Sequence, residues 1–319
     1  MAIAFGALTR PQAGSDLQAP SRHRTIGIAL AAAGLMLAGV ALIGSIIAGD
    51  LAGQADAADR VGSLGAWTFG LTTAAFGTIK LAIGLILVGI VRRIWLRVES
   101  VKAALPSLLR AQGGERGALG EYESEFGPAT ATAVAPRPLL IHRMAGLLWA
   151  PMLAMGVMLV YAGFLLSLGA AGNVTADPAL SASQRVWVQG LQFLGEGFLL
   201  SGVSFLLGTI LGAIRAGGGE VQESLSLTVR TLRMPSTAKL FIALMMAGLM
   251  VEIAQFAGYA YIATVPASAD YATFSTWLGP LREFGLGLLL SGIVLALATI
   301  AKALGFQFAR ITQIITSGR

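Results

Sequence analysis

Three ionisable side chains interrupt long apolar runs of this 319-residue chain, and their chemistry most needs an explanation. Lys80, Glu196 and Glu252 each stand in a segment composed mainly of Leu, Ile, Val, Ala, Gly and Phe. A charge inside a membrane span is costly, and by default it faces the interior of a helix bundle and has a partner there. The three residues are therefore candidates for a buried ion pair, or for a pathway that moves a proton or a solute.

The depth of each charge suggests which residues pair. Counted from the first cation at the inner end of its span, Lys80 lies about 18 Å deep and Glu252 about 20 Å deep, at 1.5 Å per residue. These similar depths predict an ion pair between Lys80 and Glu252, with Gln255 one turn away on the same face as Glu252. Glu196 lies about 28 Å from the inner end, near the outer interface where water reaches it.

Methionines form a second pattern. Met152, Met155 and Met158 follow one another at i, i+3 and i+6. Thioethers are soft ligands that suit Cu(I), but methionine also fills irregular apolar cores. We favour core packing and keep a Cu(I) site as the alternative.

We otherwise expect no metal, no cofactor and no enzymatic activity. The chain has no cysteine, and its two histidines, His23 and His142, lie beside arginines at the start of apolar segments. No Ser-His-Asp set is plausible with histidines placed there. The glycine-rich stretch at 216–220 lacks the Lys-Ser/Thr pair of a phosphate-binding loop.

The composition is that of an integral membrane protein. Hydrophobic residues make up 55% of the chain and charged residues 12%, about half the charged share of a typical soluble domain. Segments of about 20 apolar residues cross a bilayer, and in lipid only a helix satisfies the backbone of a single segment. The sequence predicts an all-α protein with six transmembrane helices, at 25–48, 64–91, 144–168, 188–214, 240–263 and 284–303.

The distribution of basic residues predicts the orientation. If the N-terminus is cytoplasmic, eighteen of the 22 Lys and Arg fall in inside segments, as the positive-inside rule requires. We therefore expect both termini in the cytoplasm of a bacterial cell, and a multi-pass protein of the inner (plasma) membrane. The net charge of +6 is then a topology signal, and we expect no nucleic-acid partner.

Two spans repeat without a gap. The sequence FLGEGFLLSGVSFLLGTI (193–210) aligns with EFGLGLLLSGIVLALATI (283–300), and the second span fits more weakly. We expect three parallel helical-hairpin repeats around a pseudo-axis along the membrane normal. The predicted organisation is an N-terminal segment (1–24), repeat 1 (25–110), a flexible cytoplasmic linker (111–142), repeat 2 (143–233) and repeat 3 (234–319).

Each repeat ends in an amphipathic stretch, at 94–109, 220–232 and 306–317. We expect these stretches to lie along the inner leaflet with their apolar faces in the lipid. The alternative is that they extend the transmembrane helices into the cytoplasm.

Small residues recur in the aligned spans. Spacings such as Gly197-x-x-x-Ser201 let helix backbones approach closely. The predicted helix-packing residues are Gly195, Gly197, Ser201, Gly202, Gly285, Gly287, Ser291 and Gly292.

Two functions remain open. The favoured interpretation is a non-catalytic structural or accessory subunit of a membrane complex, whose partners are the lipid bilayer and other membrane subunits or further copies of itself. The alternative is a small transporter or channel that uses Lys80, Glu196 and Glu252. Prolines at the edges of spans disfavour a transporter with broken helices.

Overall fold

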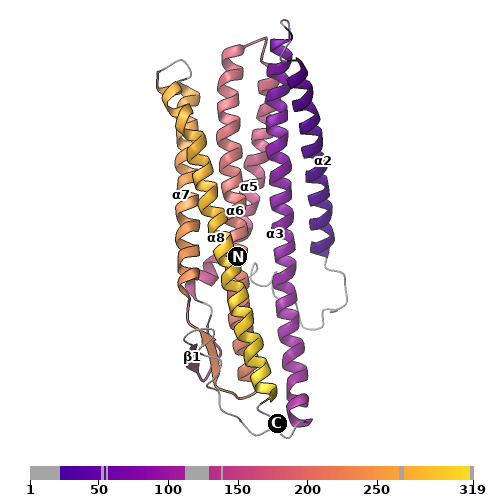
Figure 1. Ribbon diagram of the computed structural model, residues 1–319, viewed down its shortest axis with the longest axis vertical. Helices are drawn as coiled ribbons and strands as arrows, with labels where there is room; N and C mark the ends of the chain where they lie inside the picture. Colours follow the sequence, from indigo (N-terminus) through magenta and orange to yellow (C-terminus); the bar gives the residue numbers. More distant parts are fainter. Residues whose placement is uncertain are drawn as a thin grey trace.

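Six long helices run side by side along one axis (Figure 1). The computed structural model describes residues 22–51, 54, 57–111, 129–137, 139–265 and 269–316. In that part of the chain the helices are α2 (Arg22–Leu51), α3 (Ala58–Ala111), α5 (Leu140–Gly172), α6 (Pro178–Ser224), α7 (Ser236–Thr264) and α8 (Ala269–Thr316). All six are long and apolar enough to cross a membrane. The predicted all-α architecture with six spans is therefore confirmed.

Three of the helices are much longer than a bilayer requires. α3 has 54 residues, α6 has 47 and α8 has 48, whereas about 20 suffice to cross the hydrocarbon core. The amphipathic stretch 94–109 continues α3, residues 306–316 of the third stretch continue α8, and 220–232 is divided between the end of α6 and a strand. Within the described residues these stretches are thus not separate helices. Arg and Lys are good helix formers, so a helix does not stop where its apolar run ends.

A small two-stranded antiparallel sheet lies where α6 ends. Strands β1 (Ala129–Thr132) and β2 (Val229–Leu232) pair antiparallel, with Ala129 opposite Leu232. β1 falls within the predicted flexible linker 111–142, so 129–132 is ordered by pairing with a distant segment; residues 112–128 and 138 lie outside the described residues. We call the end of the bundle where α3, α6 and α8 finish, and where α5 and α7 begin, the basic end.

The side chain of Gln222 connects three elements at the basic end. It is 1% exposed, and its Oε1 accepts hydrogen bonds from the Arg230 backbone N–H at 2.9 Å and from Arg310 Nε at 3.1 Å. Its Nε2 donates to the Arg230 carbonyl at 3.1 Å. One buried amide therefore joins α6, β2 and α8.

α6 is the central helix. In its most apolar window 72% of residues are buried, against 17% in α2. The most extensive helix packing is within the hairpins α2–α3, α5–α6 and α7–α8, and α6 also packs on α3, α7 and α8. Packing between α3 and α8 is slight at most among the described residues. α3, α6 and α8 therefore form a row rather than a ring, and the threefold repeat stays a prediction.

The described spans are not broken. Pro151 lies inside α5, and Pro280, which the sequence places at the edge of a span, lies inside α8. Neighbouring helices in a bundle allow a proline within a transmembrane helix. At its start, α6 is capped by Asp177, whose Oδ1 accepts from the Leu180 N–H at 2.9 Å, with Pro178 in the first turn. This cap begins the helix ten residues earlier than its apolar run indicates.

Candidate functional site: an ion-pair cluster inside the bundle

Four charged side chains from three helices form one connected cluster. Lys80 Nζ of α3 lies 2.8 Å from Glu196 Oε1 of α6, and Arg282 Nη2 of α8 lies 3.0 Å from Glu196 Oε2. Arg282 Nη1 then contacts Glu283 Oε1 at 3.1 Å. Two cations and two carboxylates balance in charge. The cluster ties α3 and α8 to the central helix through both oxygens of one carboxylate.

The predicted ion pair between Lys80 and Glu252 is wrong. Lys80 reaches Glu196 instead, although the two residues differ in estimated depth. The reason is the arrangement of the helices: α3 packs on α6, whereas Glu252 is on α7, which packs on α6 and α8. A common depth does not make two side chains neighbours unless their helices share an interface.

Arg282 is the site residue that the sequence analysis missed. The apolar run that predicts the last span begins only at Phe284, so Arg282 falls outside the predicted span 284–303. In the structure α8 begins at Ala269, so Arg282 lies 13 residues inside the helix. The alignment of 193–210 with 283–300 contained a usable signal, since it places Arg282 opposite Gln192, one turn before Glu196.

One aromatic ring lies against Arg282. Its Cζ lies 4.0 Å from the centroid of the Phe193 ring, a cation–π distance. Phe193 also meets Phe69 of α3 and Tyr259 of α7, with ring centroids 6.0 and 5.8 Å apart. The guanidinium therefore contacts both the Glu196 carboxylate and the Phe193 ring, and that ring is itself packed against rings of α3 and α7.

Glu252 is buried without a partner. It is 0% exposed, and neither carboxylate oxygen has a hydrogen-bond partner among the described residues. A Cβ added to Gly197 of α6 would lie 2.7 Å from Glu252 Cγ, and one added to Gly285 of α8 would lie 2.6 Å from Glu252 Oε1. These two glycines thus make the space in which the Glu252 side chain lies between α6 and α8.

Buried amides accompany the acid. Gln255, on the same face of α7, donates from Nε2 to the Leu278 carbonyl at 3.4 Å. Gln192 on α6 donates to the Gly70 carbonyl at 2.9 Å. The Oε1 atoms of both amides have no hydrogen-bond partner among the described residues. Gln255 and Glu252, three residues apart on α7, are both buried in the bundle.

Apolar side chains lie beyond this polar region in both directions along the bundle. Toward the basic end, Leu199, Leu206 and Leu289 are each 0% exposed and belong to two apolar core clusters. Toward the opposite end, Ile262 and Leu278 belong to a third apolar cluster that includes Phe193 and Tyr259. The ionisable groups therefore lie between two apolar layers.

The predicted packing glycines have different environments. Gly195 and Gly202 of α6 pack tightly on α5, against Val160 and Leu153 respectively. Gly292 has only ordinary contacts, beginning at 3.5 Å, and a Cβ on Gly287 would meet nothing within 4 Å. Ser201 is fully buried with an unpartnered hydroxyl, whereas Ser291 is exposed. Gly287 and Ser291 thus form a small-residue pair on the outer face of α8.

The three methionines do not share one environment. Met152 packs against the largest apolar cluster, whereas Met155 is 46% and Met158 is 65% exposed on the outer face of α5. Core packing is therefore seen for Met152 alone. Cu(I) binding by the three stays a prediction.

Comparisons of the chain with known protein families, with curated proteins and with solved structures find no match. The class of protein is defined by the fold itself. Six helices that are long and apolar enough to span a bilayer, three of which are joined by ion pairs to the buried Glu196 carboxylate and its partner Arg282, fit a multi-pass membrane protein.

Proposed function

We propose that the chain is a non-catalytic structural or accessory subunit of a complex in the plasma membrane, with both termini in the cytoplasm. The observation that carries this proposal is the pairing of the intramembrane charges. Lys80, Glu196 and Arg282 bind one another and do not line the described cavity, which is apolar and lies between other parts of the helices. An ion-pair cluster bounded by apolar layers holds helices together.

The subunit role also requires a surface for partners. The Gly287–Ser291 pair on α8 is exposed, and Leu290 and Val294 beside it are 52% and 64% exposed. A small-xxx-small pair permits close approach of another transmembrane helix. We assign the partner helix, from another subunit or a second copy of the chain, to this face of α8.

Replacing Gly287 by leucine is expected to separate the chain from its assembly. The matched control is Gly39→Leu on α2, because a Cβ at either glycine meets nothing within 4 Å. The chain would be tagged at its own locus and extracted in a mild detergent, and the mass of the purified assembly would be measured by native mass spectrometry. We expect a discrete stoichiometric assembly that is lost in Gly287→Leu and kept in Gly39→Leu. A chain recovered alone from the unmodified cell contradicts the proposal.

Transport is the second candidate, and Glu252 is the observation that favours it. Its carboxylate has no hydrogen-bond partner among the described residues, and it interacts electrostatically with Arg282, Glu196, Lys80 and Glu283. Among these five charged residues, Glu283 lies at the surface, with a side chain that is 72% exposed, whereas Glu252 is fully buried. A series of charged side chains that runs from the surface at Glu283 to the interior at Glu252 is what a path for protons or solutes from one side of the membrane would need.

If the chain transports protons or solutes, Glu252→Gln is expected to abolish the flux, because the amide keeps the shape of the side chain but loses its ionisable group. The measurement is proton or solute flux into liposomes that contain the purified chain. Glu223→Gln is the control, since Glu223 lies at the basic end and bonds to the Ala135 N–H there. Equal flux in Glu252→Gln and unmodified chain excludes this role for Glu252.

A further inference from the structure

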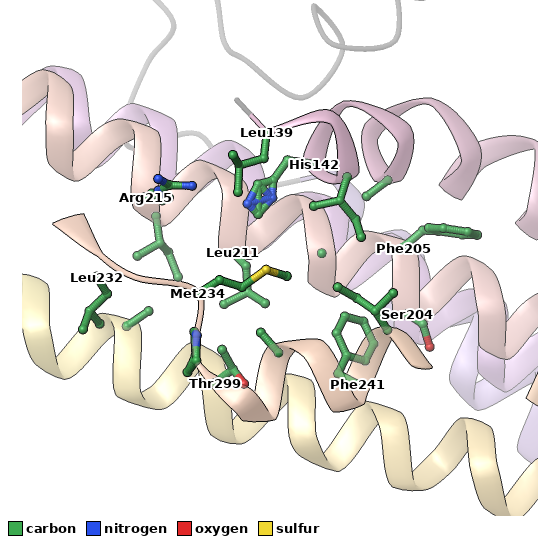
Figure 2. Close-up of a pocket in the computed structure, with 18 of the residues that line it drawn as sticks. Leu139, His142, Ser204, Phe205, Leu211, Arg215, Leu232, Met234, Phe241 and Thr299 are labelled. Atoms are coloured by element: carbon green, nitrogen blue, oxygen red, sulfur yellow. The ribbon is translucent and has the colours of Figure 1, made fainter. Parts of the chain in front are cut away.

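A large apolar pocket separates two helical hairpins at the basic end. Its volume is about 410 Å³, within the range of ligand-binding pockets. It is lined by the start of α5, the second half of α6, the connection from β2 into α7 and the last part of α8. Figure 2 shows His142 of α5 and Arg215 of α6 on one side, with Met234 and Phe241 on the other.

The wall of the pocket is open at the side of the bundle. Its apolar lining residues Leu140, Met144 and Met246 are 75%, 44% and 49% exposed. From Arg215 to Ser204, both of which line the pocket, α6 advances 11 residues, or about 16 Å. The pocket is therefore an elongated apolar groove that runs along the helices and faces the side of the bundle.

The lining is basic at one end only. Arg215, Arg233 and Lys302 line the pocket together with His142, and no lining residue is Asp or Glu. Arg233 and Lys302 are exposed. Among the described residues none of the three cations takes part in a salt bridge, and Arg215 Nε is buried without a hydrogen-bond partner. The site thus presents unpaired positive charge beside an apolar groove.

We propose that this pocket binds an anionic glycerophospholipid from the leaflet at the basic end. An acyl chain lies in the groove between α6 and α7, and the phosphate is bound by Arg215, Arg233 and Lys302. Basic pockets between transmembrane helices recognise lipid headgroups in this way. The cations select negative charge, the groove selects a hydrocarbon chain, and a phospholipid combines the two. This lipid bridges the hairpins α5–α6 and α7–α8 and is independent of the partner surface on α8.

Native mass spectrometry of the purified full-length chain tests the proposal with phosphatidylglycerol and phosphatidylcholine of identical acyl chains. We expect phosphatidylglycerol to be retained as a discrete adduct, with an affinity at least about tenfold higher than that of phosphatidylcholine, since the three cations bind the phosphate of both lipids but repel the quaternary ammonium of choline. Equal retention of the two lipids, or retention of neither, overturns the proposal without any variant.

Variants assign the lipid to this pocket. Arg215→Gln/Arg233→Gln/Lys302→Gln is expected to remove the preference for phosphatidylglycerol. The control changes three cations that do not line the pocket, as Arg137→Gln/Arg143→Gln/Lys239→Gln, and is expected to keep it. Loss of the preference in the control as well indicates general surface attraction and overturns the assignment.

Two further measurements separate the groove from the charges. Leu211→Trp, which fills the groove and leaves the cations in place, is expected to reduce lipid retention about tenfold. Excess inorganic phosphate is expected not to displace the lipid, because the acyl chain contributes to its affinity. Unchanged retention in Leu211→Trp, or displacement by phosphate alone, shows that the site binds a free anion and contradicts the lipid assignment.

Discussion

Glu196→Gln is expected to lower the free energy of unfolding by about 3–5 kcal/mol, which is the typical cost of removing one partner of a buried ion pair. The carboxylate is 6% exposed and binds Lys80 at 2.8 Å and Arg282 at 3.0 Å with separate oxygens. Its removal leaves Lys80 without a carboxylate and leaves Arg282 with only the exposed Glu283. Reversible unfolding of the purified chain in mixed micelles, followed by circular dichroism, measures the loss.

A double-mutant cycle separates the ion pair from the effects of each substitution. Lys80→Met keeps most of the side-chain volume, and alone it leaves Glu196 bound to Arg282, so we expect a smaller loss than for Glu196→Gln. The double variant is expected to lose less than the sum of the two, because contacting residues couple by about 0.5–3 kcal/mol. The cycle between Lys80 and Glu252 is expected to show weaker coupling. If that second cycle shows the stronger coupling, the pairing in the structure is wrong.

The arrangement of this ion-pair cluster explains why the spans and their charged residues could be predicted from the sequence, but the partners of those charges could not. Six spans follow from the sequence because the bilayer sets a minimum length of apolar residues. Lys80, Glu196 and Glu252 stand out in the sequence because charges in such runs are rare. Their partners were not predictable from depth, because pairing depends on which helix faces meet. α6 lies at the centre of the bundle, so Lys80 of α3 meets Glu196 rather than Glu252 of α7.

Two other features were hidden for physical reasons. Arg282 belongs to a helix that begins before its apolar run, because the start of a helix depends on local hydrogen bonding rather than on hydropathy. Gly197 and Gly285 were predicted to bring helix backbones together, and Gly285 does lie close to Gly248 of α7, yet both glycines also leave space for the carboxylate side chain of Glu252. A glycine pattern indicates a close approach, but it does not state whether a backbone or a side chain approaches.

The glycines of α6 give the second large expected effect. At Gly195 the backbones of α5 and α6 touch: an added Cβ would lie 2.9 Å from Gly156 O and 2.9 Å from Val160 N. The contact is reciprocal, since a Cβ on Gly156 would lie 2.8 Å from Gly195 O and 2.8 Å from Leu199 N. Backbone atoms on both sides leave no flexible group to move aside, so relief requires the helices to separate.

Gly195→Ala and Gly156→Ala are therefore each expected to destabilise the chain, in the upper part of the range of about 1–3 kcal/mol typical of overpacking. Gly197→Ala is expected to lose less, since its closest neighbour is the side chain of Glu252 rather than a backbone. Unfolding in mixed micelles again gives the measurement.

The same substitution at an open glycine reverses the sign. A Cβ on Gly287 or Gly39 meets nothing within 4 Å, so Gly287→Ala and Gly39→Ala are expected to stabilise the chain by about 0.5–1 kcal/mol, because alanine loses less backbone entropy than glycine in a helix. The substitution Gly→Ala is thus expected to lower the free energy of unfolding at a buried helix contact and to raise it on an exposed helix face. Stabilisation by Gly195→Ala would show that α5 and α6 are further apart than the structure places them, and the central position of α6 would then need another explanation.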